Sequence, residues 1–251
     1  MAQPFLSVII PAYNEARRIK KSFEALRRYA GSKDFSLELI VVDDGSTDSM
    51  PALLQEMRAD WPGLLVLRNE SNRGKGYSVR RGFLEAQGLY VLFTDADLST
   101  PIEEADRLLT LLESAHADAA IGSRALRRDL IGVHQRWLRE SGGRFFNLLV
   151  RLFTGLKIHD TQCGFKLFRR ETTRFAFEQQ RVDGFGFDPE ILFLIRRFGG
   201  KILEVPVRWN NDPATKVRFL RDSARMLLEL AVLRWRALTG KYGPIRGRKS
   251  G

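Results

Sequence analysis

Short apolar runs alternate with segments of helical periodicity through the first hundred residues of the chain. The apolar runs are nearly continuous, as in parallel strands that are buried on both faces of a sheet. They lie at residues 6–10, 37–42, 64–67 and 89–94. Between them, apolar side chains recur at helical spacing, for example at Ile19, Phe23 and Leu26. This alternation predicts an α/β fold with a Rossmann-like, mostly parallel sheet flanked by helices.

Beyond residue 100 the pattern becomes less regular. Residues 125–140 are rich in arginine and show no clear periodicity. Helices are expected at residues 101–114, 141–153, 187–198 and 217–238. Strands are expected at residues 119–122 and 202–207, and residues 160–168 fit a strand or a hairpin. No internal repeat or clean linker is visible, so we predict a catalytic domain over residues 1–215 and a C-terminal helix and tail over residues 216–251.

Polar clusters follow three of the four N-terminal apolar runs. They are Pro11–Glu15, Asp43–Asp48 and Asp95–Asp97. The carboxyl ends of parallel strands meet at one edge of a sheet, which is where open α/β sheets bind ligands. Asp95 and Asp97 are two residues apart, so in extended backbone their side chains point the same way. Two such carboxylates repel each other unless a cation lies between them, and oxygen ligands suit Mg²⁺ or Mn²⁺. Aspartates also form turns at strand ends, but three clusters on one edge favour a ligand site.

The charge of the chain is distributed unevenly. The 251 residues carry a formal net charge of +11, and residues 216–251 hold ten Lys or Arg against two acidic residues. This basic region predicts an anionic partner, either a nucleic acid or an acidic membrane surface, although a solvated basic face also fits. No aromatic-interleaved basic stripe or known nucleic-acid motif is present, which argues against nucleic acid.

The predicted helix at residues 217–238 has two distinct sides. Basic side chains gather on one side, and apolar side chains fill a broad opposite side. A helix that packs on the core and a helix that lies on a membrane surface both fit this pattern, and Trp235 and Tyr242 favour the membrane. No apolar run reaches the roughly 18 residues of a membrane span. The single Cys163 and an N-terminus without a signal-peptide pattern predict a reducing compartment. We expect a cytoplasmic protein, peripheral on the cytoplasmic face of a membrane.

Five motifs occur in the order seen in family 2 glycosyltransferases, which have the GT-A fold. They are Pro11–Glu15, Val42–Asp48, Asn72–Gly76, Thr94–Asp97 and Gly122–Arg124. The resemblance covers about residues 5 to 240. Two further segments, Asp160–Lys166 and Phe187–Glu190, look most like those of the dolichyl-phosphate β-glucosyltransferases, with the dolichyl-phosphate mannose synthases as a neighbouring branch. The resemblance implies an inverting, metal-dependent transferase that moves a hexose, with UDP-glucose as the expected donor, onto a dolichyl or undecaprenyl phosphate.

The resemblance also implies roles for residues on the donor side. Asp95 and Asp97 would hold Mg²⁺ or Mn²⁺ on the departing diphosphate, with Asp97 as the principal ligand. Ser99 stands where relatives can place a glutamine that completes the metal shell. Asp43 would accept a hydrogen bond from the base, and Lys216 lies where relatives carry a loop that closes on the diphosphate. The residues that would bind the nucleotide sugar are Pro11, Tyr13, Glu15, Asp43, Lys75, Asp95 and Lys216.

On the acceptor side the resemblance points to arginines. Residues 124–151 hold seven arginines against two acidic residues, and arginine suits planar recognition of phosphate oxygens. By position, Arg124 and Arg136 resemble the arginines that bind the acceptor phosphate, with Arg139 as the substitute for Arg136. Asp188 lies where relatives place a carboxylate near the reacting centre. There it would position a basic side chain or act as a weak base, and a helix cap is equally compatible.

Several alternatives fit the same residues. GDP-mannose or another nucleotide sugar could be the donor. A soluble acceptor, such as a protein or polysaccharide, could replace the polyprenyl phosphate, because relatives often carry transmembrane helices and none is visible here. A nucleotidyltransferase shares the carboxylates at strand ends, but it needs a glycine-rich phosphate loop after the first strand, where this chain has Ala12–Glu15.

Overall fold

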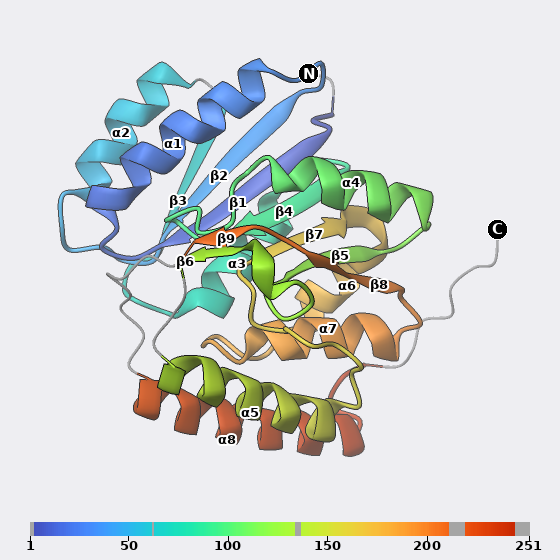
Figure 1. The fold of residues 1–251 in the computed structure, drawn as a ribbon. Helices are drawn as coiled ribbons and strands as arrows, with labels where there is room; N and C mark the ends of the chain where they lie inside the picture. Colours follow the sequence, from blue (N-terminus) through green and yellow to red (C-terminus); the bar gives the residue numbers. More distant parts are fainter. Residues whose placement is uncertain (1–2, 62, 134–136, 211–218, 244–251) are drawn as a thin grey trace.

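A computed structural model of the chain describes residues 3–61, 63–133, 137–210 and 219–243 (Figure 1). The described residues form a main sheet of seven strands in the order β3-β2-β1-β4-β7-β5-β8. These strands are Leu6–Ala12 (β1), Leu37–Asp43 (β2), Leu64–Arg68 (β3), Tyr90–Thr94 (β4), Ala119–Ser123 (β5), Phe165–Arg169 (β7) and Ile202–Pro206 (β8). All of them run parallel except β7, which lies antiparallel between β4 and β5. The prediction of a mostly parallel α/β sheet is confirmed.

Helices cover both faces of this sheet. They are Ala16–Gly31 (α1), Met50–Asp60 (α2), Lys75–Glu85 (α3), Glu104–Ser114 (α4), Trp137–Thr154 (α5), Arg170–Gln179 (α6), Phe187–Arg197 (α7) and Phe219–Leu238 (α8). Alternate residues of β1 show how the layers form, because successive side chains of a strand point to opposite faces. Val8 and Ile10 join a core with α1, α2 and α4, whereas Ile9 joins a core with α3, α6 and α7. The carboxyl ends of β1, β2 and β4 consequently share one edge.

The irregular region between β5 and β7 differs from the prediction in two places. Residues 125–140 contain a 3-10 turn at Arg128–Leu130, a short strand at Ile131–Val133 (β6) and the start of α5; β6 pairs with Trp209–Asn210 (β9). The predicted strand or hairpin at residues 160–168 is a single strand that begins only at Phe165. The backbone N–H groups of Asp160 and Thr161 donate to side chains of Glu204 and Asn147, at 2.8 and 3.3 Å. These amides are therefore not available to a neighbouring strand.

Helices α5 and α8 lie alongside each other next to α7 (Figure 1). Phe146 of α5 clusters with Met226 and Leu230 of α8. Leu233 of α8, and Tyr242 beyond its end, join the core on the α7 side of the sheet. The described part of the C-terminal region therefore shares the core of the domain. No helix of the described residues is long and apolar enough to cross a membrane.

Candidate active site

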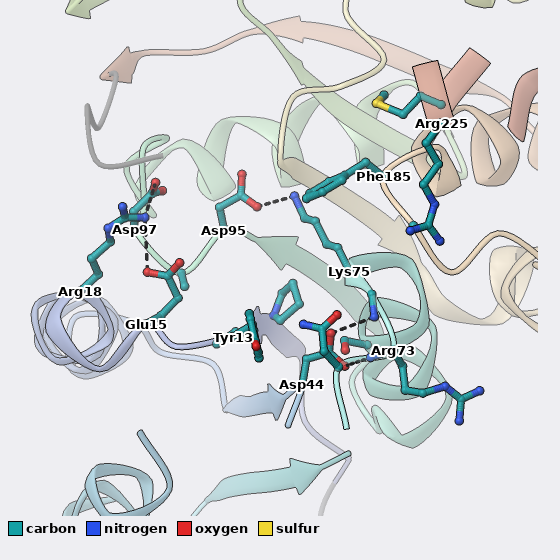
Figure 2. A pocket seen from close by; sticks show the side chains of 18 of the residues that line it. Tyr13, Glu15, Arg18, Asp44, Arg73, Lys75, Asp95, Asp97, Phe185 and Arg225 are labelled. Atoms are coloured by element: carbon teal, nitrogen blue, oxygen red, sulfur yellow. Dashed lines mark hydrogen bonds and ion pairs between the residues drawn. The ribbon is translucent and has the colours of Figure 1, made fainter. Parts of the chain in front are cut away.

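A cavity of about 670 Å³ opens at the carboxyl edge of the sheet (Figure 2). It is bounded by the segments after β1, β2 and β4, by the loops before α3 and α7, and by one side of α8. The predicted site residues that line it are Pro11, Tyr13, Glu15, Lys75, Asp95 and Asp97. Three strand ends and two loops thus bring most of the predicted donor-side residues together, as their positions after parallel strands implied.

Lys75 and Asp95 form an ion pair across the cavity, with 2.5 Å between Nζ and Oδ1 (Figure 2). Burial lowers the pKa of Lys75, but the negative charges of Asp95 and Asp188 outweigh burial, so this pKa is raised. Lys75 is therefore a permanent positive charge in the cavity and suits a phosphate group. Gly164 leaves room for the carboxylate, because a Cβ at that position would lie 1.9 Å from Asp95 Oδ2.

Asp97 is held in place by its own turn. Its Oδ1 accepts a hydrogen bond from the backbone N–H of Ser99 at 2.9 Å, and its Oδ2 lies 4.0 Å from Arg18 Nη1. Burial raises the pKa of Asp97, and the neighbouring charge of Asp95 raises it further. Two carboxylates that disfavour each other's charge suit a divalent cation. Mg²⁺ commonly binds through one or two carboxylates together with substrate phosphates, so Asp95 and Asp97 fit this ion. The described residues contain no cluster of three or more metal-ligating side chains.

Asp44, the neighbour of the predicted Asp43, is the acidic residue of β2's end that lines the cavity. Its Oδ1 accepts from the backbone N–H of Arg73 at 2.9 Å, and its Oδ2 accepts from that of Gly74 at 2.8 Å. These bonds hold the loop before α3, where Gly74 has a φ of +107° that favours glycine. Asp43 is buried outside the cavity lining, and its Oδ1 accepts from the backbone N–H of Ser46 at 2.9 Å. Its contact with a nucleotide base stays a prediction.

Asp188 is buried at the start of α7 and forms an ion pair with Lys166 of β7. Lys166 Nζ also donates to the carbonyl oxygen of Cys163 at 2.6 Å. Burial raises the pKa of Asp188, and the nearby charges of Lys166 and Lys75 offset this only in part. Asp188 does not line the cavity. It lies beside the basic side chain of Lys166, as expected if it positions such a side chain. Its part in catalysis stays a prediction.

Arg124, at the end of β5, is engaged by Asp160. The two side chains form a bidentate pair, with Nε 2.7 Å from Oδ2 and Nη2 2.8 Å from Oδ1. Burial lowers the pKa of Arg124, but the charge and hydrogen bonds of Asp160 outweigh burial and raise it. Arg124 does not line the cavity, so an acceptor phosphate at this residue would have to share it with Asp160. Its role stays a prediction.

Three other residues were predicted to bind anions. Arg136 and Lys216 lie outside the described residues, and so does the side chain of Arg139. The described cavity wall instead includes cationic residues that the sequence analysis did not identify, namely Arg18, Arg73 and Arg225. The spacing of Arg18 from Glu15 was a usable signal, because residues three apart on a helix are neighbours.

Phe185 and Glu229 are two further lining residues that the prediction missed. Glu229 and Arg225 are four residues apart on α8 and form an ion pair, with 3.2 Å between Arg225 Nε and Glu229 Oε1. That spacing is visible in the sequence. The spacing does not show which side of α8 faces the sheet. The orientation of α8 in the structure brings the pair to the cavity.

Comparisons with known proteins show the family to which the chain belongs. A model of the family described as glycosyl transferase family 2 matches residues 7–175. The chain is 34% identical over 258 residues to the dolichyl-phosphate β-glucosyltransferase of Saccharomyces cerevisiae, covering 95% of this chain and 76% of that protein. It is 36% identical over 250 residues to the protein of the same name from Drosophila melanogaster, covering 94% and 76%.

A solved structure shows the same fold. The glucosyl-3-phosphoglycerate synthase of Mycobacterium tuberculosis, in complex with Mn²⁺, UDP and glucosyl-3-phosphoglycerate, is similar with a TM-score of 0.62 and 23% identity. The similarity covers 99% of this chain and 82% of that one. The predicted GT-A architecture is therefore confirmed.

Proposed function

The chain belongs to glycosyl transferase family 2 and is a nucleotide-sugar-dependent glycosyltransferase, and we propose that it transfers glucose from UDP-glucose to a polyprenyl phosphate. The observation that carries this proposal is the cavity at the carboxyl edge, which combines Asp95, Asp97 and the cationic Lys75. Such a combination suits the diphosphate of a nucleotide sugar. The glucose and the lipid phosphate are supported by relatives whose names state that chemistry.

The donor would occupy the part of the cavity formed by β1, β2 and β4. Tyr13, whose side chain stands at the cavity, would face the nucleoside, with Pro11 and Glu15 beside it. Asp95 and Asp97 would hold Mg²⁺ or Mn²⁺. When bound, that ion neutralises charge on the departing diphosphate. Lys75 would supply a second positive charge by exchanging Asp95 for a phosphate oxygen, which the exposure of this pair permits.

The reaction itself needs little proton transfer. A phosphate oxygen of the acceptor attacks C1 of the glucose, and the bond from C1 to the diphosphate oxygen breaks, with inversion at C1. A phosphate monoester has a second pKa of about 6 and is mostly dianionic at neutral pH. The acceptor is therefore a nucleophile without a strong general base, and the cavity carboxylates are free to act as metal ligands.

The acceptor's lipid portion would lie at a membrane surface to which the protein binds peripherally. Six of the eleven exposed large apolar side chains of the described residues belong to helices α5 and α8. They are Leu148, Leu152, Leu228, Val232, Trp235 and Leu238, with exposed fractions between 40% and 72%. Within residues 146–159 and 224–243 the one acidic residue is Glu229, which lines the cavity, whereas Arg151, Lys157 and Arg234 are exposed. Apolar side chains edged by cations suit the surface of an anionic bilayer.

A donor and acceptor panel tests the proposed reaction. Purified protein is incubated with labelled UDP-glucose, GDP-mannose and other nucleotide sugars, with Mn²⁺ or Mg²⁺ and a short polyprenyl phosphate. We expect a labelled lipid with UDP-glucose. Formation of the lipid only with GDP-mannose would replace the donor, and no labelled lipid with any donor would remove the proposal.

The metal assignment is tested in the same assay with Asp97→Asn. Losing one charge-stabilising group of an active site costs roughly 10²–10³-fold in rate, so we expect transfer to fall by at least that factor. The circular dichroism spectrum and thermal midpoint should change little, because Asp97 lies at the cavity. Unchanged transfer by Asp97→Asn would exclude the metal role.

Vesicle flotation tests the peripheral membrane contact. We expect binding to vesicles that contain phosphatidylglycerol and weaker binding to phosphatidylcholine alone. The double variant Leu152→Ser/Leu238→Ser should bind less. A chain that ends at Gly243 separates the basic tail from the helices and keeps Tyr242, whose buried hydroxyl donates to Glu190 Oε1 at 2.5 Å. Equal binding of all variants would exclude this surface.

A further inference from the structure

The turn at Gly184, Phe185 and Gly186 forms part of the cavity wall. The two residues before this turn are held closely by Gly74 and the first turn of α3. A Cβ on Gly74 would lie 2.4 Å from the carbonyl oxygen of Asp183, and a Cβ on Gly76 would lie 2.5 Å from that of Val182. The backbone N–H of Tyr77 donates to the same Asp183 oxygen at 3.2 Å. Lys75 lies between the two glycines, so the position of the turn and the position of Lys75 depend on each other.

Glu229 of α8 holds the turn from the other side. Its Oε2 accepts a hydrogen bond from the backbone N–H of Gly186 at 2.9 Å. A Cβ on Gly184 would lie 2.6 Å from Oε1, and a Cβ on Gly186 would lie 2.5 Å from Oε2. Both glycines therefore allow the carboxylate to approach the backbone more closely than any other residue type would.

A carboxylate in this wall needs a reason, because the cavity suits an anion. An acidic side chain repels a diphosphate unless its charge is already engaged. Both oxygens of Glu229 are engaged, one by the Gly186 N–H and the other by Arg225. Its side chain is 17% exposed. Its negative charge is thus directed to the turn and to α8 rather than to the space where a ligand would bind.

We infer that Glu229 is a positioning residue of the donor pocket. It fixes the Gly184–Gly186 turn against the glycines that flank Lys75, and so sets where the Lys75 ammonium stands relative to Asp95. This inference rests on the proposed function, because the group that Lys75 would meet is the diphosphate of the donor. It also makes α8 part of the donor pocket, a role that neither of the two interpretations of this helix from the sequence, packing on the core or lying on a membrane, included.

Binding of UDP in the presence of Mn²⁺, measured by isothermal titration calorimetry, tests the inference without any acceptor or turnover. Glu229→Ala removes the hydrogen bond to Gly186, which is stronger than a neutral one because the acceptor is charged. We expect UDP affinity to fall by at least roughly tenfold, because the turn and Lys75 lose this support. Glu229→Gln keeps an acceptor oxygen for the Gly186 N–H and should recover most of the affinity.

A matched control is Glu178→Ala. Glu178 pairs with Arg174 four residues before it on α6, at 3.0 Å, but does not line the cavity. This variant should bind UDP as the wild type does. Equal loss in Glu178→Ala and Glu229→Ala would show a general effect of removing a helix ion pair, and would overturn the inference.

A double-mutant cycle gives the sharpest test. Gly184→Ala forces the new methyl group against the Glu229 carboxylate, so it should weaken UDP binding, and it should have much less effect in the Glu229→Ala background, where these atoms are removed. Additive effects, or wild-type affinity in Glu229→Ala, would overturn the inference. If Glu229→Ala does not fold, wild-type UDP affinity in Gly184→Ala would overturn the inference. Wild-type protein that binds neither UDP nor GDP would instead contradict the proposed function.

Discussion

Two lysine–aspartate pairs lie near the same aromatic ring, that of Phe93, yet they differ in their access to solvent. The Lys75 and Lys166 ammonium groups are 5.2 and 5.1 Å from the ring centroid. In the pair of Lys75 with Asp95 the side chains are 19% and 39% exposed, whereas in the pair of Lys166 with Asp188 they are 1% and 4% exposed. The first pair can exchange its partner for a ligand, and the second cannot do so without exposing a buried charge.

The two lysines reach this ring from different kinds of structure. Lys166 is the second residue of β7 and is directly opposite Phe93 in the antiparallel register. Lys75 is the first residue of α3. A cation at a helix N-terminus is unfavourable for the helix dipole, so helix stability alone does not explain Lys75. Its pairing with Asp95 and its place in the cavity do explain it.

The largest effect that distinguishes the pairs should be on stability. Lys166→Met leaves the Asp188 carboxylate buried without its partner, and breaking a buried pair in this way costs about 3–5 kcal/mol. We expect the free energy of unfolding to fall by that amount in urea denaturation followed by circular dichroism. Lys75→Met should cost less, because solvent reaches the 39% exposed Asp95 side chain once its partner is removed.

A double variant checks the cause of that loss. Lys166→Met combined with Asp188→Leu removes both charges, so it should be more stable than Lys166→Met alone. If Lys75→Met and Lys166→Met are equally destabilised, solvent access does not separate the two pairs.

A smaller effect, on ligand affinity, should be found when Lys75 is replaced rather than when Lys166 is. Lys75→Met should weaken binding of UDP with Mn²⁺ by roughly tenfold, or about 1.4 kcal/mol, because one charge-assisted contact to a phosphate is lost. The matched control is Lys33→Met. Lys33 pairs with Asp106 at 2.6 Å and lies 4.5 Å from the Tyr29 ring centroid, but it does not line the cavity. The same loss of affinity in Lys33→Met would show that the effect is not local to the cavity.

The sequence was sufficient to predict the donor side of the fold, for a physical reason. Strands β1, β2, β3 and β4 run parallel to one another, so the segments after β1, β2 and β4 reach the same edge. Chain order alone therefore places Asp95 and Asp97 close to Tyr13, without any information on side-chain packing. Lys75 was named with them because its turn has the motif of the family that the chain resembles. For these residues, the local sequence pattern and the order of the strands are enough to determine their place at the edge of the sheet.

The other half of the molecule depends on contacts between distant segments. That Asp188 pairs with Lys166 follows from β7 entering the sheet in the antiparallel sense, which the apolar residues of β7 do not reveal. Glu229 reaches the cavity only because Met226 and Leu230 orient α8 on α5. Helical periodicity shows that a face is apolar, but it does not show what that face contacts.

A third acid–base pair, Arg124 with Asp160, extends the comparison to pH. Burial raises the pKa of Asp160, but the charge and hydrogen bonds of Arg124 outweigh it, so the pKa is lowered in the folded protein. The contribution of this carboxylate to stability is therefore complete above the ordinary aspartate pKa of about 4, and it is lost as the pH falls through the lower folded-state pKa. The thermal midpoint should fall less steeply with acidification below about pH 4 in Asp160→Asn than in the wild type.

The slope of the midpoint against pH is the quantity to compare, because Asp160→Asn also lowers the midpoint at neutral pH. The exposed Asp60 at the end of α2 provides the control. Asp60→Asn should keep the acid slope of the wild type, since its carboxylate is not enclosed by a bidentate arginine. Identical slopes in all three proteins would mean that Arg124 and Asp160 separate readily. Arg124 would then be available to an acceptor phosphate without the competition that its bidentate pairing implies.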